Sequence, residues 1–221
     1  FADAWTMLIM LQPLLAGLFM YWYLRLLKLR YIASLLGAIA WSFSGFNVAW
    51  LTWGTIGHVV LWLPLALLSI DKSWYFLLIL SLLFQFFAGH AQISLYFMIV
   101  VLAYAVFRKA LGMRLILALG LVVLITSVQW WPLWSWLQES GRIIGTDWQK
   151  EGWFIPWAHL VQFVAPDFFG NPTTLNYWGQ WNYGEFVGYI GILPLAFAFI
   201  ATFSPPFKKY RFWIGAGGIA L

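Results

Sequence analysis

Apolar residues run through this chain in long stretches that short polar or charged clusters separate. Several of these stretches approach the length of about 20 residues that an α-helix needs to cross a bilayer. The pattern predicts about seven membrane spans followed by a truncated eighth, and hence an all-α polytopic domain. The spans cover residues 5–24, 31–51, 58–70, 74–88, 93–107, 115–131 and 186–203, and the eighth begins in the apolar run 212–221.

Three regions follow from this order. Residues 1–132 hold transmembrane helices one to six, residues 133–184 form an extracytoplasmic Trp-rich segment, and residues 185–221 hold helix seven and the start of the next. Within the middle region, residues 153–161 predict a short helix with Pro156 near its first turn, which lies in the membrane interface because it is too short to span. Because the chain starts without Met and stops inside an apolar run, we expect a fragment of a longer protein.

The composition agrees with a membrane protein. Apolar residues make up 63% of the chain and charged residues 9%, whereas soluble domains carry about a quarter charged residues. The net charge of +5 does not indicate nucleic acid, because the basic residues lie in short loops at span ends, where they set topology and meet anionic lipid. The absence of Cys excludes a disulfide framework and a thiolate metal site.

The charges separate by side of the predicted membrane. Ten of the twelve Lys and Arg residues fall on one side, and six of the seven carboxylates fall on the other with all three histidines. The basic side is cytoplasmic by the positive-inside rule. The basic set is Arg25, Lys28, Arg30, Lys72, Arg108, Lys109, Arg114, Lys208, Lys209 and Arg211, and the opposite set is Asp3, Glu139, Asp147, Glu151, Asp167, Glu185, His58, His90 and His159. Titratable groups suited to chemistry therefore gather on the outer face.

Four groups of motifs, in this order and spacing, resemble a known family. They are LAGLFMY at 15–21 with Arg25 and FSGF at 43–46; GH at 57–58 with WLPL at 62–65; AGHAQ at 88–92 with Tyr96; and Gln129, Pro132, SGR at 140–142, PDFFGNP at 166–172, YWG at 177–179, Glu185 and GYIGILPL at 188–195. The set is similar to the YfhO-like bacterial membrane proteins, which belong to the GT-C class of integral-membrane glycosyltransferases. The chain departs from the family at Ala91, where Pro is usual.

The resemblance implies a GT-C fold in a bacterial plasma membrane. It also implies transfer of a sugar from a polyprenyl-phosphate donor to an envelope polymer or lipid acceptor on the outer face. That reaction needs a carboxylate base, a cation that neutralises the departing phosphate, and a surface that holds the sugar. The family has an acidic loop ahead of the first span, which we expect upstream of this chain, so the catalytic residue is unknown.

Arg142 is the candidate for the donor phosphate, because a guanidinium group binds two phosphate oxygens at once. The alternative is a surface ion pair with Glu139 or Asp147, worth under about 1 kcal/mol. His90 and Gln92 lie at a predicted helix break near the membrane surface and are candidates for the sugar or the cavity wall. Their alternative role is to bond free backbone groups at a helix end.

Asp167, Glu185, Trp178, Trp181 and His58 complete the candidate sugar and cavity residues. The two carboxylates would bind sugar hydroxyls or a divalent metal; otherwise Asp167 caps a turn and Glu185 is a favourable charge at a helix N-terminus. Nine of the seventeen Trp residues lie between Trp130 and Trp181. Trp178 and Trp181 are the candidates for stacking on a sugar, while most of the others suit anchoring in the membrane interface.

No His or carboxylate pair has metal-ligand spacing such as H-E-x-x-H, so we predict no metal site and no certain cofactor, although a divalent metal stays open. Two other functions also remain open. A transporter or lipid flippase predicts charges inside the membrane and inverted repeats, and the sequence shows neither. A non-catalytic envelope assembly protein would keep only the fold. The expected partners are the lipid-linked donor, the acceptor and the bilayer, but not nucleic acid.

Overall fold

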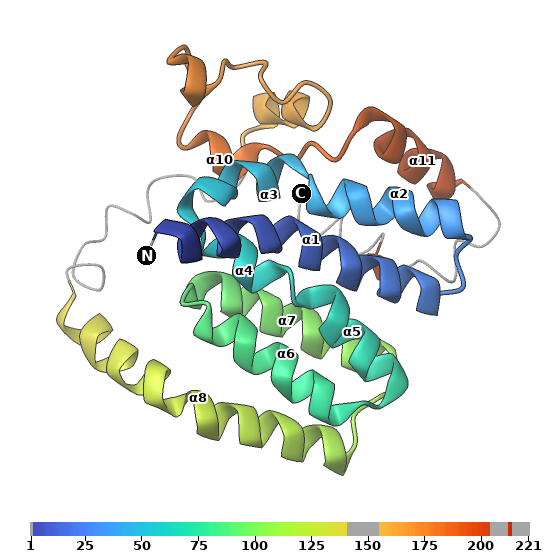
Figure 1. The fold of residues 1–221 in the computed structure, drawn as a ribbon, viewed down its shortest axis with the longest axis vertical. Helices are drawn as coiled ribbons and strands as arrows, with labels where there is room; N and C mark the ends of the chain where they lie inside the picture. Colours follow the sequence, from blue (N-terminus) through green and yellow to red (C-terminus); the bar gives the residue numbers. More distant parts are fainter. Residues whose placement is uncertain (1, 141–154, 204–211, 214–221) are drawn as a thin grey trace.

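The computed structural model describes residues 2–140, 155–203 and 212–213, and over these ranges the chain forms helices and no strand (Figure 1). The elements are α1 (Ala2–Leu26), α2 (Tyr31–Ser42), α3 (Gly45–Trp50), η1 (Leu51–Trp53), α4 (Ile56–Val60), α5 (Leu63–Lys72), α6 (Tyr75–Phe87), α7 (Ala91–Phe107), α8 (Met113–Glu139), η3 (Trp157–Phe163), η4 (Pro172–Thr174), α10 (Tyr183–Phe186) and α11 (Ile192–Thr202). The η elements are 3₁₀ helices.

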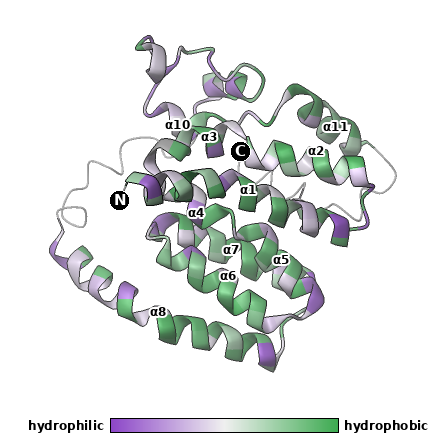
Figure 2. Ribbon diagram, viewed as in Figure 1, coloured by the Kyte–Doolittle hydropathy of each residue, from purple (hydrophilic) through white to green (hydrophobic). Residues whose placement is uncertain are grey.

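Three helical stretches are long and apolar enough to cross a membrane. They are Ala2–Leu26, Tyr31–Trp50 (α2 with α3) and Met113–Glu139, while α6, α7 and α11 are shorter apolar helices. Figure 2 shows hydrophobic residues along most of the helix surfaces and hydrophilic residues mainly at the turns and in the segment above α3. These features indicate a membrane protein.

The helices run back and forth between two ends of the molecule (Figure 1). The α1–α2, α5–α6 and α7–α8 connections lie at one end, which we call the basic end because Arg25, Lys72 and Arg108 lie there. The start of α1, the α6–α7 turn with His90, and α3 lie toward the other end, which we call the histidine end. Arg25, Lys72 and Arg108 therefore lie at the end of the molecule opposite His90.

Two of the predicted spans are each divided into two helices. In the 31–51 span, α2 ends at Ser42, and the Ser44 side chain starts α3 by accepting a hydrogen bond from Asn47 N at 3.4 Å. In the 58–70 span, α4 and α5 are separated immediately before Pro64, which lies at the start of α5. Proline suits that place because its missing N–H has no partner there in any case.

The predicted spans six and seven correspond to α8 and α11, and both helices differ from the predicted limits. The predicted span six ends at residue 131, but α8 continues through Pro132 to Glu139. The predicted span seven starts at residue 186, but α11 starts at Ile192, and Gly191 with φ of +99° separates it from the four-residue α10. Glycine adopts this backbone conformation at no steric cost, whereas other residues rarely do.

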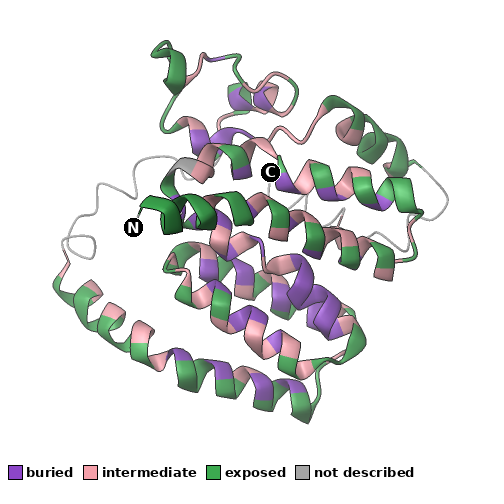
Figure 3. Ribbon diagram, in the orientation of Figure 1, coloured by how far each residue is buried: buried purple, intermediate pink, exposed green. Residues whose placement is uncertain are grey.

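The core lies among α4, α5, α6, α7 and the first half of α8 (Figure 3). Every α5 residue from Pro64 to Ile70 is buried. Buried positions on α8 are Leu115, Ala118, Val122 and Thr126, which follow one helix face and end halfway along it. Beyond Thr126 the described part of α8 has no buried residue, so the described fold covers this half less than the first half.

Candidate functional site

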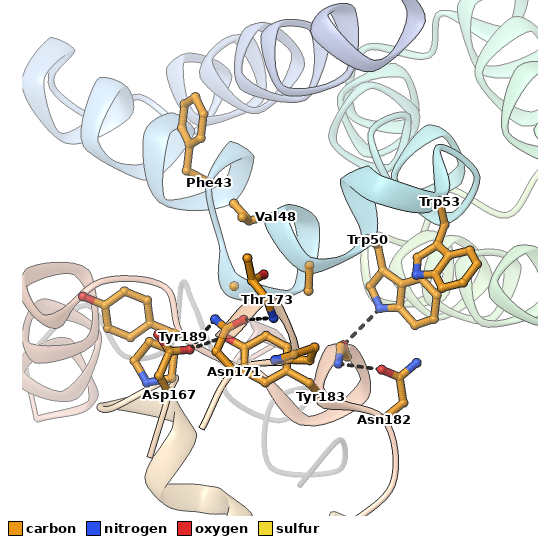
Figure 4. Close-up of a pocket in the computed structure, with 15 residues that line it drawn as sticks. Phe43, Val48, Trp50, Trp53, Asp167, Asn171, Thr173, Asn182, Tyr183 and Tyr189 are labelled. Atoms are coloured by element: carbon orange, nitrogen blue, oxygen red, sulfur yellow. Dashed lines mark hydrogen bonds between the residues drawn. The ribbon is translucent and has the colours of Figure 1, made fainter. Parts of the chain in front are cut away.

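A cavity of about 600 Å³ lies between α3 and the segment that carries η4 and α10, near the histidine end (Figure 4). We call it the Asp167 cavity. Its wall contains the rings of two Trp and two Tyr residues. A carboxylate, two amides and a hydroxyl group lie beside these rings. The lining residues that carry these groups are Trp50, Trp53, Tyr183, Tyr189, Asp167, Asn171, Asn182 and Thr173.

Asp167 is the carboxylate of this cavity, and its orientation is fixed by two donors. Oδ1 accepts a hydrogen bond from Asn171 Nδ2 at 2.9 Å and one from the Tyr183 hydroxyl at 2.7 Å. No residue in the described ranges donates to Oδ2, and the side chain is exposed. One carboxylate oxygen is therefore held in place while the other remains able to accept from a ligand.

The environment of Tyr183 keeps its hydroxyl group protonated. Partial burial raises the pKa of Tyr183 well above its ordinary value, and the hydrogen bond to Asp167 raises it further. Burial also raises the pKa of the neighbouring Tyr177. Partial burial and the hydrogen bond to Asp167 both disfavour the phenolate form of Tyr183. Its hydroxyl group therefore acts as a hydrogen-bond donor to Asp167 over the whole physiological pH range.

The loop that carries Asp167 is ordered by its own asparagines. Asn171 Oδ1 accepts from Thr173 N at 2.9 Å, which starts η4. Asn176 Oδ1 accepts from Asn171 N at 2.9 Å and from the Thr174 hydroxyl at 2.7 Å. Gly170 has φ of +82°, and a Cβ there would collide with the Asn176 backbone, so the loop requires glycine at this turn.

Contacts between distant parts of the sequence hold this segment on α3. Trp50 Nε1 donates to Gly184 O at 3.0 Å, and Gly45 N donates to Tyr189 O at 2.6 Å. A Cβ at Gly45 would lie 2.7 Å from Val187 Cγ2, so a larger residue would push the two segments apart. Glycine at position 45 therefore allows the close contact that forms one wall of the cavity.

His159 supports the cavity from behind. Its ring is 2% exposed and stacks on Phe169 with ring centroids 4.4 Å apart. Gln180 N donates to Nε2 at 3.3 Å, so the ring proton is on Nδ1, which lies 2.6 Å from Gln162 Oε1. Gln162 Nε2 in turn donates to Pro166 O at 3.0 Å, next to Asp167. His159 is therefore a structural residue of this segment.

Of the eight site residues that the sequence predicts, Asp167 lines the cavity. Glu185 is exposed on α10 beside the lining residue Gly184, but it does not line the cavity itself. Trp178 packs edge-on against Phe169 with centroids 4.8 Å apart and is 68% exposed. Trp181 is 50% exposed, with φ of +58°. Arg142 lies outside the described residues.

The other predicted polar residues lie on α4 and at the start of α7, and one of them caps a helix. His90 caps α7, where its Nδ1 accepts from Ile93 N at 3.4 Å, and Gln92 Nε2 donates to the Tyr96 hydroxyl at 3.0 Å. His58 lies on α4, and its Nε2 is buried without a partner among the described residues. None of the three lines the Asp167 cavity.

The polar partners of Asp167 were not predicted from the sequence. Tyr183 is 16 positions away and Trp50 lies 134 positions from Gly184, so no local pattern links them. Asn171 gave a signal, since it stands in the Pro- and Gly-bounded loop with Asp167. The described residues contain no group of three or more His, Asp or Glu side chains placed to hold a metal ion.

The chemistry of the wall suits a ligand rich in hydroxyl groups. A carboxylate oxygen and amide groups pair with hydroxyls, and the aromatic rings offer flat apolar faces beside them. The volume falls within the range of about 300–1,000 Å³ that is usual for small-molecule sites. No family model matches the chain, and neither the curated proteins nor the solved structures give a match.

Proposed function

We propose that this chain belongs to an integral-membrane glycosyltransferase of GT-C type, which moves a sugar from a polyprenyl-phosphate donor to an envelope polymer or lipid. The observation that carries the proposal is the Asp167 cavity, in which an oriented carboxylate with one available oxygen faces amide and aromatic side chains. A sugar presents both hydroxyl groups and apolar C–H faces, and this wall has a partner for each.

The position of the cavity supports a lipid-linked substrate. It lies near the histidine end, opposite the basic end, and the positive-inside rule places the basic end in the cytoplasm. In a bacterial plasma membrane the cavity then faces outward at the level of the lipid headgroups. A polyprenyl-phosphate sugar has its sugar at that depth and its chain in the bilayer.

The proposed reaction is a single displacement. The acceptor hydroxyl oxygen bonds to the anomeric carbon while the bond from that carbon to the phosphate oxygen breaks, and the polyprenyl phosphate leaves with the electron pair. A carboxylate base takes the acceptor proton. In this scheme Asp167 binds a hydroxyl of the transferred sugar, and Arg142 neutralises the departing phosphate.

A transfer assay in membranes with a radiolabelled polyprenyl-phosphate sugar tests the proposal. Asp167→Asn keeps the shape of the side chain but replaces an acceptor with a donor. Because a hydrogen bond to a charged group contributes about 1.5–3 kcal/mol, this change should lower kcat/KM by roughly 10- to 100-fold. Arg142→Ala should abolish transfer. Asp3→Asn is the matched control, since Asp3 is exposed at the histidine end and does not line the cavity.

The outcomes separate the site from the function. If the wild type transfers sugar and the Asp167→Asn variant transfers it equally well, the Asp167 cavity is not the sugar site. Transfer that survives Arg142→Ala would contradict the phosphate role. A properly inserted wild type that transfers no sugar from any common lipid-linked donor would contradict the enzyme itself and favour a transporter.

A further inference from the structure

The Asp167 cavity carries a negative charge that its own walls do not balance. Two stretches of chain form the wall, one from Phe43 to Trp53 and one from Pro166 to Tyr189. The first lies within residues 31–71 and the second within residues 152–207, and neither of these ranges contains Lys or Arg. Since Asp167 is the charged residue among those that line the cavity, the described lining residues give the site a net negative charge.

The carboxylate keeps one oxygen available for a ligand. Oδ1 accepts from Asn171 Nδ2 and from the Tyr183 hydroxyl, whereas no described residue donates to Oδ2. Among the described residues the ion pair is that of Arg108 with Asp71 at the basic end, so Asp167 has no basic partner there. A positively charged donor complements such an oxygen best, because a charge-assisted hydrogen bond is roughly twice as strong as a neutral one.

Aromatic rings add to the preference for a cation. Figure 4 shows Asp167 and Asn171 at one end of the cavity and Trp50 and Trp53 at the other. Trp50 is held in place by the hydrogen bond from its Nε1 to Gly184 O at 3.0 Å. The face of an aromatic ring attracts a cation electrostatically, and it also packs against apolar C–H groups. The cavity therefore suits a ligand that has both a positive charge and an apolar face.

We propose that the sugar bound in the Asp167 cavity carries a protonated amino group, which pairs with Asp167 Oδ2. The inference rests on the proposed function, because it names the class of sugar that the same site takes. An ammonium group is a donor with the charge that a hydroxyl group lacks. Asn182, whose Oδ1 accepts from Gly184 N at 3.1 Å, and the Thr173 hydroxyl line the cavity as partners for the other hydroxyl groups of the sugar.

Binding of methyl glycosides to the full chain in lipid nanodiscs tests the inference without turnover, and saturation-transfer NMR gives the dissociation constants. Methyl β-glucoside is the reference ligand. The probes are its derivatives that have an amine in place of the hydroxyl group at C2, C3, C4 or C6. At a pH where the amines are protonated, at least one of them should bind about five-fold more tightly than the glucoside, as expected when a charged donor replaces a neutral one.

Asp167→Asn removes the charge and keeps the shape of the side chain, so the amine and the glucoside should bind this variant equally well. Asp3→Asn is the matched control and should keep the preference, since Asp3 is exposed and does not line the cavity. In the wild type the preference should also disappear when the pH is raised until the ligand amine is neutral. That measurement replaces the variant if Asp167→Asn does not fold.

The outcomes separate this inference from the proposed function. If the glucoside and every amine bind equally well, or if none of them binds, the inference is wrong. A preference that Asp167→Asn retains would also overturn it, and so would choline binding more tightly than every amino sugar, which would indicate a lipid headgroup instead. If the preference for an amine depends on Asp167 but the chain transfers no lipid-linked sugar, the amino-sugar site stands and the glycosyltransferase does not.

Discussion

Arg108 Nε lies 2.6 Å from Asp71 Oδ1 and joins the end of α7 to the last turn of α5. The same carboxylate accepts a hydrogen bond from the Tyr104 hydroxyl at 2.9 Å through Oδ2, and Tyr104 accepts one from the Tyr23 hydroxyl at 3.0 Å. The Asp71 side chain is 4% exposed, whereas that of Arg108 is 43% exposed. One nearly buried carboxylate therefore connects α1, α5 and α7 at the basic end.

Asp71→Ala should destabilise the protein by about 2 kcal/mol, because it leaves the Tyr104 hydroxyl without its acceptor and removes the partner of Arg108. The thermal unfolding midpoint in detergent measures this effect. Lys72→Ala is the control, since Lys72 is the exposed neighbour in the same turn. Equal midpoints for the two variants would show that the network adds nothing to stability.

His159→Leu should loosen the segment that carries the Asp167 cavity. The change leaves Gln162 Oε1 and Gln180 N without their partner, at a cost of about 2–4 kcal/mol for the two groups together. Hydrogen exchange of residues 155–186 should rise. His90→Leu, which removes only a helix cap worth about 1 kcal/mol, should affect stability less and should leave that segment protected. The reverse order would contradict the structural role of His159.

Tyr183 should be among the last tyrosines to ionise, because burial raises its pKa above the ordinary value. A raised pKa in the folded state means that the stabilisation is complete below about pH 10 and is lost as the pH rises through the folded pKa. Tyr183→Phe should therefore reduce the latest phase of tyrosinate absorbance in an alkaline titration. An unchanged late phase would contradict the contact with Asp167.

The chain has no Cys, so single cysteines can report the orientation in the membrane. Thr174→Cys, in the exposed η4, should react with a membrane-impermeant maleimide in intact cells. Lys72→Cys, at the exposed end of α5, should react only after the membrane is opened. The opposite pattern would place the Asp167 cavity in the cytoplasm and exclude an outward-facing sugar site.

The sequence predicts α6 and α7 within about two residues, since their apolar runs end at clear turn signals. Ser73 and Gly89, both with positive φ, separate the helices there. The end of α8 was not predicted, because Pro132 is a strong helix breaker in water. In a bilayer a helix that stops early exposes several unpaired backbone groups, so continuing through one proline costs less.

The Asp167 cavity was only partly predictable. The turn-rich loop identified Asp167, because Pro and Gly on either side mark an exposed turn. The role of His159 was not visible in the sequence, since Gln180, 21 positions away, donates to its ring. Burial of a histidine in a polar loop depends on which distant chain segments pack over it, and apolar periodicity carries no information about that.

The six residues of α3 have one consequence for any molecule that the protein binds. Gly45, Val48 and Ala49 line the Asp167 cavity, while Phe46 and Asn47 line a second, apolar cavity of about 770 Å³, so α3 is a common wall one helix thick. A displacement of this helix changes the volume of both spaces at once. If a ligand on one side shifts α3, it changes the space on the other side, and by reciprocity a ligand on that side would alter the binding of the first by the same factor.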